Sequence, residues 1–247
     1  GLVGSEMCIR DRFRQGAKAL ILCNPSNPCG KVFTYDELKI IADLAIKYDA
    51  YVITDEVYEH IVYAPNKHIY MASLPGMRER TIVCNSLSKT YSITGWRLGY
   101  VIANPQVIDR VKKVHDFLTV GAAAPLMEAA VTGLKFGDDY YEGLAAHYTH
   151  MKELFCGGLK NLGFTFTEPQ GAYYVLMDVS EFGVKDDVKF CEWMTEHVGV
   201  AAVPGSSFFR EDVHNLIRFH FAKKDETLNA ALDNLATLRA KADGFKE

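Results

Sequence analysis

Three clusters of polar residues hold the side chains best suited to chemistry, and each cluster follows a short apolar run. The clusters span residues 24–30, 55–58 and 85–89. In an open parallel sheet, ligands bind outside the carboxyl ends of the strands, which is where such clusters would lie. Each cluster taken alone is more simply a turn, a helix cap or a solvated surface. Taken together, the three clusters predict a single pocket at one edge of a sheet.

The residue types in these clusters suit one particular chemistry. A pyridoxal phosphate site requires a lysine that can form a Schiff base, a carboxylate for the ring nitrogen, a hydroxyl, an amide and groups that hold a phosphate. The sequence offers a candidate for each of these roles: Lys89, Asp55, Tyr58, Asn27, and Ser86 with Arg97. These groups indicate pyridoxal 5'-phosphate as the cofactor.

Alternating strands and helices would place the three clusters at one edge. Short apolar runs predict strands at 17–23, 51–54, 81–84 and 98–102. A capping box formed by Thr34 and Glu37 predicts a helix that continues to about residue 48, and Pro105 begins another helix. This alternation predicts an α/β domain, with a mainly parallel sheet and flanking helices.

The C-terminal part of the chain has a different pattern. Helical periodicity covers residues 124–136, 139–161, 187–198 and the segment after Asp225, and strands are expected near 164–167, 172–178, 200–203 and 216–221. We therefore expect a cofactor-binding large domain at 13–150 and a smaller C-terminal α+β domain at 151–247. Residues 1–12, GLVGSEMCIRDR, resemble a translated sequencing adaptor and are predicted to be a foreign leader.

Composition and charge exclude several classes of protein. The chain has 247 residues, 49% of them apolar and 23% charged, and its net charge is −4, which argues against intrinsic disorder. No run of like charges suggests nucleic acid or a membrane surface as a partner, and no apolar stretch is long enough to span a bilayer. The six cysteines are scattered without zinc-site spacing, so we expect no metal and a cytoplasmic chain with reduced thiols.

Three motifs in this order identify a family resemblance. NPSNPCG, DEVYEHIVY and NSLSKTYSITGWRLGY resemble successive signatures of the class I/II aminotransferases, which are fold-type I pyridoxal phosphate enzymes. The similarity extends from Phe13 to the C-terminus. The resemblance implies that residues 13–150 form an incomplete fold-type I large domain, and that the sequence is N-terminally truncated. It also implies a homodimer when the protein is complete, and a fragment that by itself is a poor catalyst or none.

The resemblance also implies a role for each residue of the motifs. Asn27 and Tyr58 would hydrogen-bond the phenolic oxygen of the cofactor, and Asp55 would pair with its pyridine nitrogen. Lys89 would be the Schiff-base lysine, and Ser86 and Arg97 would hold the phosphate. Cys29 stands where the family usually has threonine, a change that we do not expect to abolish binding.

A further candidate, Arg218, lies in the expected strand at 216–221. Alternation places it on one face with Leu216 and His220, among large apolar residues, where an unpaired charge would be unfavourable. A protein carboxylate is one possible partner. The family resemblance instead implies that Arg218 binds the substrate α-carboxylate, for which a planar guanidinium is well suited.

The resemblance implies transfer of an amino group from an L-amino acid to a 2-oxo acid. A pyridoxal phosphate-dependent C–S β-lyase is an alternative, because elimination begins with the same proton abstraction. A non-catalytic effector-sensing domain of a regulator is an alternative of another class. No arginine occurs between Arg110 and Arg210, so this stretch offers none for a second substrate carboxylate. This favours neutral or aromatic amino acids, although aspartate stays open.

Overall fold

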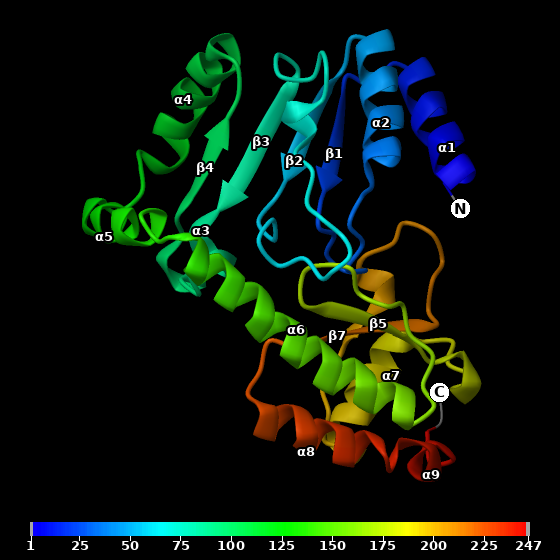
Figure 1. Ribbon diagram of the computed structural model, residues 1–247. Coiled ribbons are helices and arrows are strands. Elements are labelled where there is room, and N and C mark those ends of the chain that lie inside the picture. The colour runs from blue at the N-terminus through cyan, green and yellow to red at the C-terminus, as the bar shows by residue number, and fades with distance from the viewer. Residues whose placement is uncertain (1, 246–247) are drawn as a thin grey trace. The chain divides into compact units, whose positions relative to one another are not determined.

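The computed structural model describes residues 2–245, which form two compact units (Figure 1). Unit 1 comprises residues 2–25 and 32–144, and unit 2 comprises residues 26–31 and 145–245. The division thus falls after residue 144 rather than 150, and it groups the turn at 26–31 with the C-terminal part. The assignment of a cofactor-binding domain and a small domain to these parts stays a prediction.

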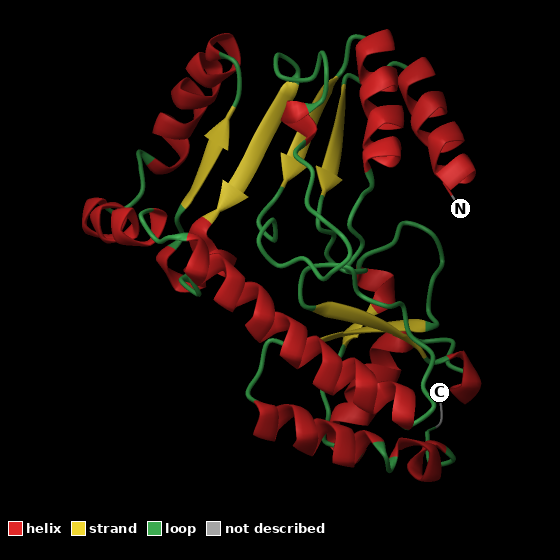
Figure 2. Ribbon diagram, in the orientation of Figure 1, coloured by secondary structure: helices red, strands yellow, loops and turns green. Residues whose placement is uncertain are grey.

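Unit 1 is built around a four-stranded sheet (Figure 2). Its strands, in spatial order, are β1 (Ala19–Cys23), β2 (Tyr51–Asp55), β3 (Thr81–Ser86) and β4 (Gly99–Ile102). The pairs β1·β2 and β2·β3 are parallel, whereas β3·β4 is antiparallel. The predicted α/β class with a mainly parallel sheet is therefore confirmed, with an antiparallel strand at one edge.

Helix α2 (Tyr35–Lys47) covers part of this sheet and shows how the sequence determines local structure. The predicted capping box is present, because Thr34 Oγ1 accepts from the backbone N–H of Glu37 and Glu37 Oε2 accepts from that of Thr34. The buried face of α2, which includes Leu38 and Ile41, packs with Val52 of β2. Helix α2 therefore shares one hydrophobic core with β1 and β2, the strands that precede two of the polar segments.

The remaining helices of unit 1 are short or lie at its surface. They are α1 (Leu2–Arg14), α3 (Leu87–Thr90), α4 (Pro105–Thr119) and α5 (Ala124–Leu134), with 3-10 turns η1 (Met71–Ser73) and η2 (Thr94–Trp96). Residues 2–12 of the predicted foreign leader lie within α1, where Ile9 packs against the core, whereas residue 1 lies outside the described residues; the foreign origin stays a prediction. On α4, Val114, Phe117 and Leu118 are exposed.

Unit 2 has a three-stranded antiparallel sheet in the order β5 (Tyr174–Asp178), β7 (Leu216–His220) and β6 (Val203–Pro204). Its helices are α7 (Asp187–His197), α8 (Asp225–Leu235), α9 (Leu238–Ala242) and most of α6 (Asp138–Asn161), with 3-10 turns η3 (Ser180–Phe182) and η4 (Gly205–Ser207). No helix among residues 2–245 is long and apolar enough to cross a membrane.

Two strands predicted for unit 2 differ from the structure. The segment near 164–167 forms a single bridge, Phe166 with Met177, and no strand. Pairing stops there because Pro169 has no N–H and the next two residues, Gln170 and Gly171, donate to Gly30 instead. The strand expected at 200–203 is only the two-residue β6, Val203–Pro204, and residues 200–202 are not in a strand.

Candidate active site

The carboxylate of Asp55 lies at the end of β2 on an exposed face of the sheet. It is paired in register with Cys84 of β3, and burial of the Cys84 thiol, with a smaller effect of the Asp55 charge, raises the pKa of Cys84. The Oδ1 atom of Asp55 accepts a hydrogen bond from the backbone N–H of Val57 at 3.3 Å. The carboxylate is therefore oriented by its own turn and presented toward solvent.

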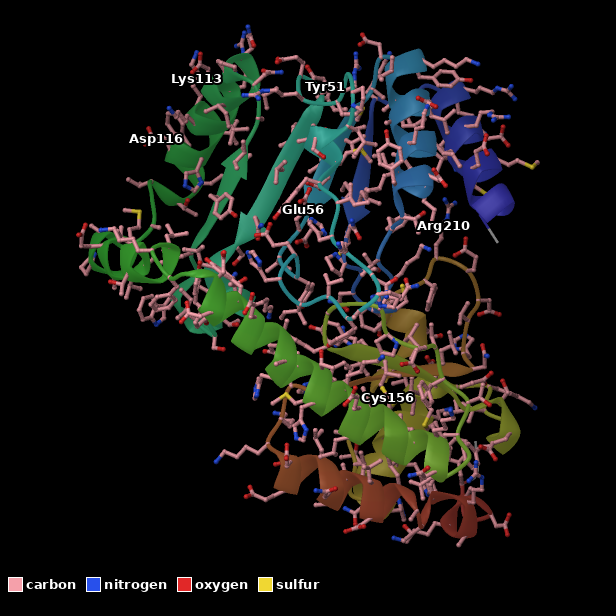
Figure 3. All side chains as sticks on the ribbon, in the orientation of Figure 1. Tyr51, Glu56, Lys113, Asp116, Cys156 and Arg210 are labelled. Atoms are coloured by element: carbon pink, nitrogen blue, oxygen red, sulfur yellow. The ribbon has the colours of Figure 1, made fainter. Side chains whose placement is uncertain are left out.

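Tyr58 and Glu56 follow Asp55 and are both buried. Tyr58 is only 3% exposed. Glu56 is 1% exposed and its Oε2 atom lies 2.9 Å from Nε2 of His68, and Figure 3 shows Glu56 where β2 ends. At the end of β2, the exposed carboxylate of Asp55 is therefore followed by two buried side chains, Glu56 and Tyr58, which anchor the segment.

The segment from β3 into α3 carries Ser86 and Lys89. Ser86 is the N-cap of α3, and its Oγ accepts from the backbone N–H of Ser88 at 3.1 Å. The same hydroxyl lies 2.9 Å from the carbonyl oxygen of Leu98, to which it donates. Lys89 lies half-buried in the single turn of α3, three residues after this cap. A serine hydroxyl and the lysine are thus held on one short rigid turn.

Arg97 lies directly before Leu98, which accepts the hydrogen bond from Ser86 at the start of α3. Its backbone is left-handed, with φ of 56°, and its Nη1 donates to the carbonyl of Thr94 at 2.8 Å. A non-glycine residue in this region is strained and is tolerated only where its surroundings hold it. Arg97, whose guanidinium is exposed, therefore directly precedes Leu98, the residue whose carbonyl oxygen accepts from the Ser86 hydroxyl.

The sequence reasoning missed Asn85 and Glu59, which link the segments after β2 and β3. The Nδ2 of Asn85 donates to Oε1 of Glu59 at 2.6 Å, and its Oδ1 accepts from the backbone N–H of Ser86 at 2.7 Å. Glu56, Glu59 and His68 also offer ligand atoms within 4.8 Å of one another. Their atoms already bond within the cluster or to Asn85. The sequence did offer one signal: Asn85 directly precedes the predicted site residue Ser86, and a buried amide needs hydrogen-bond partners.

In unit 2, the structure brings Asn27 and Arg218 together. Nη1 of Arg218 donates to Oδ1 of Asn27 at 2.6 Å. The guanidinium carbon lies 4.4 Å from the ring centre of Tyr174 and 4.6 Å from that of Phe208. In the described part of the chain, no carboxylate pairs with Arg218, and its buried Nε atom has no hydrogen-bond partner. The protein-carboxylate interpretation is therefore wrong for these residues.

The turn that carries Asn27 is held by backbone bonds within unit 2. The carbonyl of Gly30 accepts from the N–H groups of Gln170 and Gly171, at 2.8 and 2.9 Å. Gly30 has a φ of 67°, and an added Cβ would lie 3.0 Å from Gly171 O, so glycine suits this position. Cys29, which replaces the expected threonine, donates its S–H to Ser26 Oγ at 3.3 Å. The substitution therefore keeps a polar contact within the turn.

The predicted site residues thus form two sets. Unit 1 holds Asp55, Tyr58, Ser86, Lys89 and Arg97 on the segments that follow β2 and β3, and on the approach to β4. Unit 2 holds the bonded pair Asn27 and Arg218. That the two sets act on one ligand stays a prediction.

With this geometry established, comparison with known proteins identifies the class. Residues 8–235 match the family model for aminotransferase class I and II. The chain belongs to this family, as its three motifs suggested.

The relatives that the chain resembles are named for several different substrates. The chain is 37% identical to kynurenine–oxoglutarate transaminase 3 of Rattus norvegicus, over 94% of this chain and 56% of that protein. It is 34% identical to methionine aminotransferase of Escherichia coli, over 90% and 58% of the two chains. Among solved structures, N-succinyldiaminopimelate aminotransferase from Mycobacterium tuberculosis superposes with a TM-score of 0.87 at 34% identity, covering 93% of this chain and 61% of that one. The chain therefore spans little more than half the length of these relatives.

Proposed function

We propose that the protein is a pyridoxal phosphate-dependent aminotransferase, in which Lys89 binds the cofactor covalently and Arg218 binds the substrate carboxylate. The observation that carries this proposal is the arrangement of neighbouring strand ends in unit 1. Asp55 ends β2 in register with Cys84 of β3, and Ser86 and Lys89 follow Cys84 on the same strand and its turn. This arrangement places a carboxylate, a capping hydroxyl and an amine at adjacent carboxyl ends.

The residues present fit the chemistry of the cofactor. Asp55 is exposed and its Oδ1 atom accepts a hydrogen bond from its own turn, which leaves a carboxylate oxygen for a protonated ring nitrogen. Ser86 and Arg97 lie on connected segments and would hold the phosphate, and Asn27 and Tyr58 would hold the phenolic oxygen. When bound, pyridoxal phosphate supplies an electron sink for charge that develops at the substrate Cα.

The residues of the chain would then divide the work as follows. The carboxylate of Asp55 would lie beside the ring nitrogen and would favour the protonated ring. Lys89 would act as the general base that removes the proton from the substrate Cα. Arg218 orients the substrate through its carboxylate, since a planar guanidinium can donate two parallel hydrogen bonds.

The amino donor proposed is a neutral or aromatic L-amino acid, and the acceptor is a 2-oxo acid. Support comes from the absence of arginine between Arg110 and Arg210, which leaves no guanidinium there for a side-chain carboxylate. Relatives named for kynurenine and methionine are consistent with this class, whereas one named for aspartate is not. A homodimer and a cytoplasmic location belong to the same proposal, and sedimentation of the complete protein would test the dimer.

Borohydride reduction of the complete protein containing this sequence, followed by peptide mapping, tests the central assignment. We expect the reduced cofactor on the peptide containing Lys89. Lys89→Ala should abolish both the label and the visible absorption, whereas the matched variant Lys39→Ala, which removes an exposed lysine paired with Asp43, should keep both. A label on another lysine would show that the assignment is wrong.

Asp55→Ala tests the role of the carboxylate separately from attachment of the cofactor. The variant should still label at Lys89, because attachment needs the amine and not the carboxylate. Transamination should slow at the proton-removal step, so a substrate carrying deuterium at Cα should show a full primary isotope effect on kcat. Loss of that isotope effect in Asp55→Ala would contradict the role.

A further inference from the structure

The buried carboxylate of Asp187 serves no established part of the site. It is 0% exposed and lies at the start of α7. The cap of that helix is the preceding residue, Asp186, whose Oδ1 accepts from the backbone N–H groups of Val188 and Lys189. Asp187 is therefore not needed to begin the helix, and its acceptors are available for other donors.

The donors to Asp187 come from the segment between β6 and β7. Oδ2 accepts from the backbone N–H of Ser206 at 2.8 Å, and Oδ1 accepts from the Ser206 hydroxyl at 2.9 Å. Nδ1 of His214 lies 2.9 Å from the same Oδ1, and Nε2 of His214 lies 2.8 Å from Asp212. Figure 3 shows Arg210 on this segment. One buried carboxylate thus joins both ends of the loop 205–215.

The same loop contacts Arg218 through Phe208. Val203, just before it, is paired in register with Arg218, and the ring of Phe208 lies 4.6 Å from the guanidinium carbon. The loop also lies very close to β7, because a Cβ added at Gly205 would be 2.3 Å from the carbonyl oxygen of Leu216. The position of Phe208 over the guanidinium therefore depends on the bonds that hold residues 205–207.

A charge buried as fully as that of Asp187 is unfavourable unless hydrogen bonds compensate it. Here the bonds from Ser206 and His214 compensate it, and they lower the pKa of Asp187 against the opposing effect of burial. The carboxylate is therefore ionised and is stable only while the loop stays in place. The loop therefore stabilises the charge of Asp187, and the charged carboxylate in turn holds the loop in place.

We propose that Asp187 is a positioning residue for substrate binding: through Ser206 and His214 it holds the loop 205–215, and with it Phe208, against the guanidinium of Arg218. The inference rests on the proposed role of Arg218 as the carboxylate-binding residue. Tyr174 and Phe208 flank the guanidinium, so its plane is set partly by a ring that Asp187 keeps in place. A misplaced plane loses the geometry needed for two parallel bonds to a carboxylate.

The test uses the complete protein containing this sequence and the variant Asp187→Asn, which keeps the size but loses the charge. We expect KM for both the amino acid and the 2-oxo acid to rise about tenfold, the usual effect of losing a bond to a charged group. We expect kcat to change less than about twofold, because Lys89 and the proton step are untouched. Calorimetric titration with a 2-oxo acid should show the same tenfold weakening.

Two further variants separate positioning from general destabilisation. Phe208→Leu should raise KM in the same way, and Phe208→Tyr should restore it, because tyrosine keeps the ring over the guanidinium. Arg239→Gln is the control, since Arg239 bonds Glu181 and the carbonyls of Leu162 and Gly163 rather than the loop. It should lower the melting temperature without changing KM. If Asp187→Asn does not fold, His214→Gln provides the milder test.

The outcomes distinguish this inference from the function on which it rests. If Arg218→Lys leaves KM unchanged, the proposed role of Arg218 fails. If Arg218→Lys raises KM while Asp187→Asn changes only the melting temperature, as Arg239→Gln does, Asp187 is purely structural and the inference is overturned. A parallel rise in KM for Asp187→Asn and Phe208→Leu, with rescue by Phe208→Tyr, supports it.

Discussion

Arg218 and Asn27 lie 191 residues apart in the chain, yet Nη1 of Arg218 donates to Oδ1 of Asn27 at 2.6 Å. The bond joins the residue proposed to bind the substrate carboxylate to one proposed to contact the cofactor. It occupies one of the five N–H groups of the guanidinium, and the two flanking rings restrict the rest of the side chain. A shift of Arg218 on binding a substrate carboxylate would therefore also shift Asn27, and the reverse would hold as well.

Arg218→Lys should reduce kcat/KM for amino and 2-oxo acids alike by about 100-fold, because an ammonium keeps the charge but loses the planar fork. Attachment of the cofactor to Lys89 should be unaffected. Steady-state kinetics with several donors and acceptors would measure the loss, and Arg239→Lys, on the surface of the same unit, is the matched control. An unchanged kcat/KM for Arg218→Lys would contradict the assigned role.

Gly205→Ala should destabilise unit 2 by about 1–3 kcal/mol, the usual cost of forcing extra volume into a packed site. The reason is steric, since the added Cβ would lie 2.3 Å from Leu216 O, a backbone atom that cannot move without shifting β7. Urea denaturation would measure the change. Gly157→Ala in α6 is the control, because its Cβ would meet nothing within 4 Å, and it should stabilise the helix by about 0.5–1 kcal/mol. Equal effects from the two changes would contradict the steric argument.

The features that the sequence predicted well are local ones. The capping box of Thr34 and Glu37 depends on two residues three positions apart, and the structure has both of its bonds. Short apolar runs predicted strands at 51–54 and 81–84, and in the structure these strands extend further, to Asp55 and Ser86. At 164–167 the residues Phe-Thr-Phe-Thr alternate as in a strand, yet only a single bridge forms because the backbone N–H groups that follow bond elsewhere.

The features that the sequence missed depend on distant partners. Asp187 follows another aspartate at a helix start, so nothing local distinguishes a cap from a buried carboxylate that bonds Ser206 and His214. Glu59 and Asn85 meet across 26 residues, and neither type is unusual where it stands. For Arg218 the sequence predicted the need for a partner. The structure supplies an amide and two rings, which no local pattern reveals, and it leaves the Nε atom without a hydrogen bond.

His68→Ala should lower the free energy of unfolding by about 3–5 kcal/mol, because it leaves the buried carboxylate of Glu56 without its partner. The two side chains are 6% and 1% exposed and lie 2.9 Å apart. Removing an exposed partner should matter far less, and Lys39→Ala, which breaks the solvent-exposed pair with Asp43, should change the unfolding free energy only slightly. Guanidinium chloride titrations of both variants provide the comparison, and similar losses would show that burial of the Glu56 pair is unimportant.

The stability that His214 contributes should depend on pH in a defined direction. Its hydrogen bonds to Asp187 and Asp212 raise the pKa of His214 above the ordinary value of 6.5. A raised pKa in the folded state stabilises the protein fully below pH 6.5, and this contribution is lost as pH rises through the raised pKa. The difference in unfolding free energy between the protein and His214→Gln should therefore be largest in mildly acidic buffer and shrink at higher pH. His147→Gln, which changes an exposed histidine on α6, is the control for the loss of a histidine and is measured over the same pH range. A difference that grew between pH 6.5 and pH 9 would mean that His214 is held neutral, and that its bond to Asp187 is not between charged groups.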